Sequence, residues 1–391
     1  MPRRHILSAR QRSALLDLPT DEAALLRHYL LADDDLIHID RRRRPENRIG
    51  FALQLCALRY PGRTLAPGEL IPHTVSAFLG AQLGIAGETL AAYAVRRQTR
   101  HQHMEALRRI YGYRMFPGRG PYARAFRDWL LAEAEQARSN DDLARRFIAR
   151  CRETMTILPA ITTIERLCAD ALVAAERRIE KRIAARLDPV ACDGLDRLTT
   201  EMLPGAISRF IWLRRIEPGN NSAAANRLLD RLEFLRAMNL NDGILAGVPP
   251  HRVARLRQGE RYFADGLRDL GADRRRAIMA VCVIEWATAT ADAVIETHDR
   301  IVGRTWRDAK QLHDARVVET RGATTATLNG FTALGQSLLE AHGDGASLED
   351  AVAGGAGWER LTSLVATAKT LTDTLGDDPL AYVDQGYHRF R

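Results

Sequence analysis

The sequence predicts an all-α protein, with several small helical domains near its amino end and longer helices after them. Apolar residues recur at spacings of three and four through most of the chain, which is the period of an amphipathic helix. No stretch shows the sustained apolar–polar alternation of a half-buried strand. Proline–glycine pairs such as Pro61-Gly62 and Pro67-Gly68 divide residues 1–117 into short segments.

The charge of the chain is concentrated in its first part. The net charge is +8 and the sequence pI is about 9.5. Residues 1–150 hold 25 Arg and 16 acidic residues, whereas residues 151–391 hold 32 basic and 33 acidic residues. The only lysines are Lys181, Lys310 and Lys369. A basic front joined to a neutral remainder favours a polyanionic partner such as nucleic acid, although a GC-rich genome also enriches arginine.

The cysteines and the hydropathy pattern predict an intracellular protein. The five cysteines are widely spaced and form no C-x-x-C pair, which is typical of reduced core thiols. The basic start has no apolar run behind it, so we expect no signal peptide. The longest strongly apolar run, residues 277–284, is too short to span a bilayer. We therefore expect a cytoplasmic, nucleoid-associated protein without a membrane partner.

The segment 41–63 is the most informative part of the chain. Four consecutive arginines precede Pro45, a residue that suits the first turn of a helix. A buried stripe is predicted to follow, made of Ile49, Leu53, Cys56 and Tyr60. Arginines beside a helix N-terminus form a strong anion site, because free N–H groups and guanidinium groups converge on one phosphate. Alternatively, residues 35–43 form a short helix whose C-terminus the arginines complement.

A second basic helix is predicted from residue 97 onward. Met104, Leu107 and Tyr111 would pack inward, while Arg97, His101 and Arg108 share one flank. Gln98 and Thr99 have side chains that bind base edges or phosphates. A solvated helix face without a ligand explains the same pattern.

Longer helices are expected in the rest of the chain. Apolar residues from Ile164 to Leu187 have helical spacing, and Asn221-Ser222 is a plausible N-cap for a helix that contains Leu228, Leu232 and Leu235. A third pattern runs from about residue 272 to 302, and Gly-rich breaks at 343–345 and 354–357 interrupt the helices after it. These breaks predict domains at 1–117, 118–218 and 219–391, the last one connecting or dimerising.

The sequence lacks a recognisable catalytic or metal motif. No P-loop, G-x-S-x-G or H-E-x-x-H pattern is present. Residues 33–35 are three aspartates, which fit a helix start better than a metal cluster, and His101-x-His103 lacks acidic or thiolate companions. A metal-dependent nuclease that uses Glu296 and His298 is a third interpretation, and a polar network on a helix surface explains these residues better. We expect no cofactor, no metal, no small-molecule substrate and no enzyme activity on this chain.

Several short blocks resemble the replicative Tn-three (Tn3) family of bacterial transposases. They span essentially the whole chain in the family's order. The blocks are Met1–Arg4 with Ile6–Ser8, Asn47–Ala52, Gln54–Cys56, Leu58-Arg59, Pro61-Gly62, Gln98–Arg100 with His103, Gly112–Arg114, Phe116, Ile157–Pro159, Glu165-Arg166, Arg177–Ile179 and His298–Ile301. Family members commonly have Arg-Glu-His after Gln-Thr-Arg, where this sequence has His101-Gln102-His103.

The resemblance implies a helical region that recognises the terminal inverted repeats of a transposon in double-stranded DNA. It also implies connecting and dimerisation parts, hence a possible homodimer. In the family, a further domain of RNase H type uses Asp-Asp-Glu carboxylates and magnesium, and no residue of this chain matches that domain. The residues expected to bind DNA are Arg41, Arg42, Arg43, Arg44, Asn47, Arg48, Arg59, Arg63, Arg97, Gln98, Thr99 and Arg100.

The sequence therefore predicts the DNA-binding portion of a transposase, truncated before its catalytic domain. One or two short helices of residues 1–117, arranged like a helix-turn-helix, would enter a major groove. The alternative is a helical interaction protein whose basic patch binds an acidic protein partner.

Overall fold

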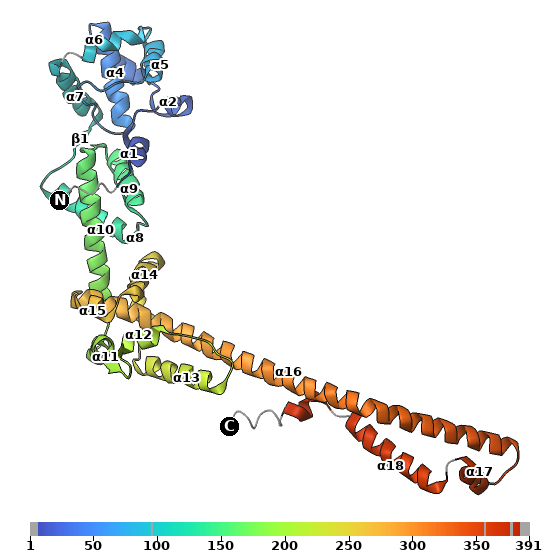
Figure 1. Cartoon of the computed structure of the whole chain (residues 1–391). Coiled ribbons are helices and arrows are strands. Elements are labelled where there is room, and N and C mark those ends of the chain that lie inside the picture. The colour runs from blue at the N-terminus through green and yellow to red at the C-terminus, as the bar shows by residue number, and fades with distance from the viewer. Residues whose placement is uncertain (1–6, 95–96, 356, 376–377, 384–391) are drawn as a thin grey trace. The chain divides into compact units, whose positions relative to one another are not determined.

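A computed structural model of the chain describes residues 7–94, 97–355, 357–375 and 378–383 (Figure 1). These residues are overwhelmingly helical, which confirms the all-α prediction. The chain forms two compact units. Unit 1 comprises Met1–Leu187, Ile244–Gly259 and Leu270–Ile278, and unit 2 comprises Asp188–Gly243, Glu260–Asp269 and Met279–Arg391.

Short helices open unit 1, as the proline–glycine pairs predict. They are α1 (Ala9–Leu16), α2 (Glu22–His28), α3 (Asp33–Asp40), α4 (Pro45–Arg59), α5 (His73–Leu83), the 3-10 helix η1 (Gly87–Thr89), α6 (Leu90–Ala94) and α7 (Arg97–Tyr111). We call residues 18–113 the first module. Two helices flank the four arginines, because α3 ends at Asp40 before them and α4 starts at Pro45 after them, and phosphate contact by these arginines stays a prediction.

Helix α4 lies at the centre of the first module and is buried on two sides. Ile49, Leu53 and Cys56 pack in one cluster with residues of α2, α5 and α6, which confirms the predicted stripe. Phe51 and its neighbours pack in another cluster with α3 and α7. Gly50 permits this close packing, since a Cβ there would lie 2.4 Å from the ring of Tyr93. The amino end of α4 is thus the most exposed part of this helix, and its middle, from Ile49 to Leu58, is buried.

A second module follows, made of residues 7–16 and 114–187. Its helices are α8 (Pro121–Gln136), α9 (Asn140–Glu153) and α10 (Ile161–Ala184). The predicted apolar spacing of α10 is confirmed, with Ile164, Cys168 and Ala175 in the core that α8 and α9 complete. Leu7 and Leu15 join the same core, so helix α1 packs on the second module although it is first in sequence.

Strands are very short among the described residues. β1 (Arg114–Met115) pairs in parallel with β2 (Thr156–Ile157), and β3 (Met202–Leu203) pairs antiparallel with β4 (Ile207–Ser208). The first pair joins the end of the first module to the second. Neither pair creates a sheet with a face of its own, which is consistent with the lack of strand periodicity.

The remaining elements are helical. They are α11 (Pro189–Thr200), α12 (Arg209–Arg214), α13 (Ser222–Ala237), η2 (Asp242–Leu245), α14 (Pro250–Arg257), η3 (Gln258–Arg261), α15 (Ala264–Arg268), α16 (Ala272–Gly343), α17 (Leu348–Gly355), α18 (Trp358–Leu375) and η4 (Pro379–Tyr382). The predicted N-cap of α13 is confirmed, because the Asn221 side chain accepts a hydrogen bond from the amide of Ala224 at 2.9 Å.

Helix α16 is much longer than the sequence pattern predicted. The expected end near residue 302 is wrong, since the helix continues to Gly343. No proline interrupts this stretch, and its glycines are isolated, so each one weakens the helix without ending it. Gly330 has a packing role, because a Cβ there would lie 2.7 Å from Leu364 of α18. The α16–α18 hairpin therefore depends on a small residue at this point.

Helix α16 also contains an 18-residue window apolar enough to cross a membrane, and 56% of that window is buried within the protein. A core helix meets the same criterion of length and hydropathy. The run Ala277–Val283 is almost wholly buried, as expected of such a helix.

Candidate nucleic-acid interface

The four arginines Arg41 to Arg44 form the turn between α3 and α4. Arg41, Arg43 and Arg44 are exposed. Among the described residues, no carboxylate pairs with Arg41 or Arg43, and Arg44 lies 3.9 Å from Glu46. Arg44 is also the N-cap residue of α4. Its side chain accepts no hydrogen bond from the first-turn amides of α4, so these amides have no side-chain partner at the N-cap. Three guanidinium groups and a helix N-terminus therefore meet at one solvent-facing corner.

Arg42, Asn47 and Arg48 lie partly within the fold. The guanidinium carbon of Arg42 is 4.5 Å from the ring centroid of Phe51, a cation–π contact. Burial and the neighbouring charge of Arg41 lower the pKa of Arg42. Arg48 pairs with Asp40 at the end of α3. Arg42 and Arg48 thus hold the turn in shape, and the contact of all three side chains with DNA stays a prediction.

Arg59 is held inside the first module by the buried carboxylate of Asp35. Its guanidinium lies 2.7 Å from Asp35, which is only 1% exposed. The same carboxylate accepts hydrogen bonds from the hydroxyl of Tyr111 at 2.8 Å and from the amide of Ala32 at 2.8 Å. Asp35 thus joins α3, α4 and α7, and the Arg59 side chain remains 30% exposed, so its contact with DNA stays a prediction.

Arg63 is engaged in a similar way. Its guanidinium forms a two-pronged ion pair with Glu69 and donates to the carbonyl of Leu16 at 2.7 Å. The Glu69 carboxylate in turn accepts a hydrogen bond from the backbone amide of Ala66 at 2.7 Å. We assign Arg63 a role in fixing the loop before α5, and its contact with DNA stays a prediction.

Helix α7 begins at Arg97, whose side chain lies outside the described part of the structure. Gln98 is exposed and Thr99 is partly exposed. Arg100 instead donates to the carbonyls of Leu65 and Ala66 at 3.1 and 3.0 Å, so it fastens α7 to the loop before α5. The inward packing of Met104, Leu107 and Tyr111 is confirmed.

His103 connects α7 to the arginine turn. Its ring makes an edge contact with Phe51 at 5.3 Å, and Phe51 also carries Arg42. Its Nδ1 lies 3.1 Å from the hydroxyl of Tyr93, and the same hydroxyl accepts a hydrogen bond from the side-chain amide of Gln54. Burial, and then the charge of Arg42, lower the pKa of His103 to about 4. The ring is therefore neutral at pH 7 and serves packing.

This lowered pKa predicts a loss of stability in acid. The unfolded chain takes up a proton at His103 near its ordinary pKa of 6.5, whereas the folded chain does so only near about 4. The free energy of unfolding should therefore fall as the pH decreases from about 6.5 to about 4. Urea unfolding at several pH values would show a shallower fall for His103→Gln than for the unchanged chain. Parallel curves for the two proteins would contradict the assignment.

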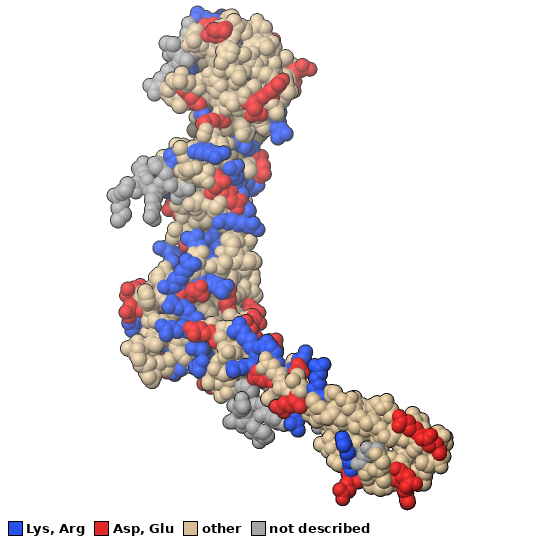
Figure 2. All heavy atoms as spheres, turned by 45° about the vertical axis from the view of Figure 1, so that its right-hand side comes forward, with Lys and Arg blue, Asp and Glu red and all other residues tan. Residues whose placement is uncertain are grey.

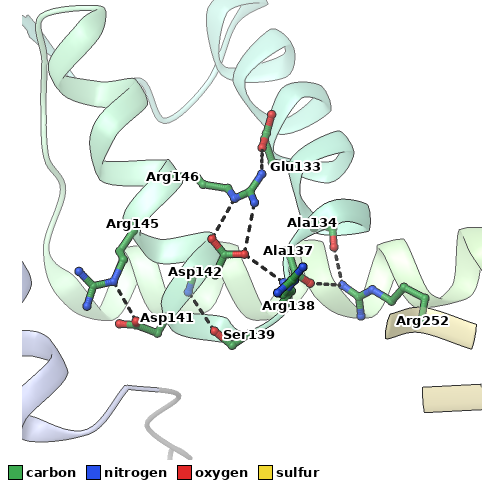
Figure 3. Close-up of polar contacts among 10 residues, drawn as sticks. All are labelled: Glu133, Ala134, Ala137, Arg138, Ser139, Asp141, Asp142, Arg145, Arg146 and Arg252. Carbon is green, nitrogen blue, oxygen red and sulfur yellow. Dashed lines mark hydrogen bonds and ion pairs between the residues drawn. The ribbon is translucent and has the colours of Figure 1, made fainter. Parts of the chain in front are cut away.

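The corner between α8 and α9 carries many charges that neutralise one another (Figure 3). Arg146 binds Glu133 at 2.8 Å and Asp142 at 3.0 Å. The hydrogen bond from Arg146 lowers the pKa of Asp142. The Asp142 carboxylate also accepts a hydrogen bond from the backbone amide of Arg138 at 3.0 Å. Ser139 caps α9 by accepting the amide of Asp142 at 3.1 Å. These pairs stabilise the corner and leave little unbalanced charge there.

Arg252 of α14 closes the end of α8 in the same view (Figure 3). Its side chain is buried and donates to the carbonyls of Ala134 and Ala137, which α8 leaves unpaired at its C-terminus. Glu176 of α10 lies 3.6 Å from the same guanidinium. A cation in this position complements the helix dipole, so Arg252 is structural.

Exposed arginines without ion pairs also occur on the second module. On the face drawn in Figure 2, Lys and Arg atoms show sparsely over the first module and more densely further along the chain. The exposed arginines of the second module for which the described residues provide no carboxylate partner are Arg10, Arg114, Arg119, Arg124, Arg127, Arg138, Arg177 and Arg186.

Comparison with known proteins shows what this chain is similar to. Residues 6–171 match a family described as "Domain of unknown function (DUF4158)". The whole chain aligns with the transposase for transposon Tn21 from Escherichia coli at 32% identity, covering 100% of the chain and 40% of that relative. The transposase for transposon Tn501 from Pseudomonas aeruginosa is 30% identical, with 100% and 40% covered. The whole chain is therefore similar to transposases of the Tn3 family.

Its match to the family is with the N-terminal part of a Tn3 transposase. A more distant member, the transposase for transposon Tn1546 from Enterococcus faecium, is 26% identical and covers 99% of the chain. The chain spans about 40% of the length of the curated relatives it matches. Among the residues that the structure describes, no cluster of three or more His, Cys, Asp or Glu side chains could hold a metal ion.

The roles of two structural residues do not follow from the sequence. The three aspartates at residues 33–35 predict a helix start, and nothing local distinguishes Asp35 from its exposed neighbours. No local pattern marks Arg252. In both cases the partners are distant in sequence, at residue 59 for Asp35 and at residues 134–137 for Arg252.

Proposed function

We propose that this chain is the DNA-binding portion of a Tn3-family transposase and recognises the terminal inverted repeats of a transposon. The exposed cluster of Arg41, Arg43 and Arg44 at the amino end of α4 carries the proposal. Charged side chains on a rigid corner bind phosphates with little loss of conformational freedom. The family match supports DNA as the polyanion, since the relatives are named transposases.

The same proposal assigns the reading of bases to α7. Helix α4 is too buried to enter a groove, whereas α7 exposes Gln98, His101, Gln102, Glu105 and Arg109 at helical spacing. Glutamine pairs with adenine edges and arginine with guanine edges in the major groove. The arginine turn would then fix the position on the backbone while α7 contacts the bases. The helix-turn-helix-like character of this region stays part of the proposal.

We further propose that the later helices connect and dimerise the protein. Exposed apolar residues occur along α16 and α18, including Val318 at 69% and Val365 at 52% exposure. Such residues at helical spacing are typical of helix–helix association. In this proposal, magnesium is bound by the catalytic domain of the family and not by this chain. The protein acts on DNA in the bacterial nucleoid, in the cytoplasm.

The salt dependence of DNA binding tests the proposed function. If the exposed arginines displace counterions from phosphates, the logarithm of affinity should fall linearly with the logarithm of salt, with a slope of about −0.9 per contact. We expect a loss of about a hundredfold or more between about 50 and 200 mM salt, measured by gel shift with an inverted-repeat duplex.

Competition separates DNA recognition from general binding of acidic partners. We expect the repeat duplex to compete better than a scrambled duplex and better than heparin at equal charge. A flat salt response, or equal competition by heparin, would reject the proposed function and favour an acidic protein partner.

A further inference from the structure

The two modules of unit 1 share one structural element at their junction. Ile157 is buried in the core of the first module with Phe51 and Leu107. The next residue, Leu158, is buried in the core of the second module. Because Ile157 and Leu158 are adjacent but lie in different cores, the modules cannot separate without exposing at least one of these two side chains.

A backbone hydrogen bond crosses the junction. The amide of Leu158 in the second module donates to the carbonyl of Gly62 in the first module at 2.9 Å. Gly62 has a φ of +101°, which favours glycine. A Cβ at this position would lie 3.2 Å from the Cγ of Arg152. A larger residue at this position would therefore be strained by its positive φ and would require the Arg152 side chain to shift slightly.

Arg152 of α9 reaches across this junction into the first module. Its Nε donates to the carbonyl of Pro61 at 2.8 Å, and its guanidinium carbon lies 4.5 Å from the ring centroid of Tyr60. The ring of His28 stacks on Tyr60 at 4.4 Å with an interplanar angle of 7°. Two groups cannot occupy the same face of one ring at these distances, so His28 and Arg152 enclose Tyr60 between them.

The contacts of Arg152 differ from those of its neighbours on the same helix. Arg145 pairs with Asp141 at 2.8 Å, and Arg150 lies 3.7 Å from Glu153, both within α9. Arg152 has no carboxylate partner among the described residues and bonds instead to a carbonyl and a ring of the first module. Its planar guanidinium suits this combination of stacking and hydrogen bonding, which lysine cannot reproduce.

We propose that Arg152 is a positioning residue that locks the two modules into one rigid body. The lock sets the spacing between the arginine turn of the first module and the exposed arginines of the second, so that both engage one duplex in a fixed helical phase. This inference rests on the proposed function as far as DNA is concerned. A rigid link raises the effective concentration of the second contact and restricts binding to the geometry that matches its span.

The lock itself is tested without DNA. Spin labels at Thr74→Cys of α5 and Ala149→Cys of α9, both exposed positions, report the distance between the modules. Cys192→Ser removes the one cysteine that is not buried. We expect a narrow distance distribution for the parent, a broadened one for Arg152→Ala and for Arg152→Lys, and no change for the matched control Arg145→Ala. An unchanged narrow distribution for both Arg152 variants would overturn the inference.

The helical phase is tested with duplexes that carry insertions between the two segments protected in a footprint. We expect the parent to lose about tenfold in affinity with a half-turn insertion of about 5 base pairs, and to recover with a full turn of about 10. Arg152→Lys, which retains the charge, should bind the unaltered duplex more weakly and lose this periodicity. A change in folding alone would not remove the periodicity.

The outcomes separate the two proposals. If the parent binds no duplex, the proposed function fails, and the label distances still decide whether Arg152 locks the modules. If the parent binds without any phase dependence, or if Arg152→Lys keeps the full periodicity, the inference of fixed phase is overturned while DNA binding stands.

Discussion

Replacing Arg41, Arg43 and Arg44 together by glutamine is expected to lower the affinity for repeat-end duplex by about a hundredfold at about 0.15 M salt. At this salt concentration, each phosphate contact raises the binding constant about fivefold through the release of counterions, and the factors of three contacts multiply. The slope of log affinity against log salt should become shallower by about 3. Because these side chains are exposed and make at most one loose ion pair, the variant should fold normally.

The matched control removes the same charge from unit 2. Arg215, Arg227 and Arg236 are exposed, and their replacement by glutamine should change the affinity much less. Gel shifts at several salt concentrations, with thermal unfolding of each variant, make the comparison. If the two triple variants lose affinity equally, net charge explains binding and the arginine turn has no special role.

Replacing Asp35 by alanine is expected to destabilise the first module by about 3 kcal/mol, because it removes the carboxylate from a buried ion pair. The change also leaves the hydroxyl of Tyr111 and the amide of Ala32 without their partner. Arg59 would then face the module interior with no carboxylate. The loss should concentrate in α3, α4 and α7, the helices that Asp35 joins.

Urea unfolding of the full chain, read by hydrogen exchange in those three helices, measures this effect. Asp34→Ala is the control, since Asp34 is exposed on the same helix and should change stability by less than about 0.5 kcal/mol. Similar effects at both positions would show that the first-turn acids stabilise α3 through the helix dipole alone, and that the network around Asp35 is unimportant.

Local features of the fold could be predicted from the sequence. The stripe of α4 and the apolar spacing of α10 follow from the helical period, and the cap at Asn221 follows from the residue type. These features depend only on residues within a few positions of one another. The full length of α16 does not follow from the apolar pattern, which extends only to about residue 302, although the helix ends at the glycine-rich break that the sequence shows at 343–345.

The candidate site could be predicted only in part. Segment 41–63 was located correctly as a helix preceded by arginines, but the sequence did not distinguish exposed from internally paired arginines. That distinction depends on tertiary partners such as Asp35 for Arg59 and Glu69 for Arg63. The buried position of His103 likewise depends on contacts with Tyr93 and Phe51 from other helices.

The placement of Ile157 and Leu158 in separate hydrophobic interiors has a thermodynamic consequence. If the hydrophobic core of one module unfolds, the residue that it buries is displaced, and the adjacent residue in the core of the other module is displaced with it. We therefore expect the two modules to unfold together. A substitution that loosens one interior therefore lowers the stability of both. Related chains cannot exchange one module alone without also matching this pair of residues.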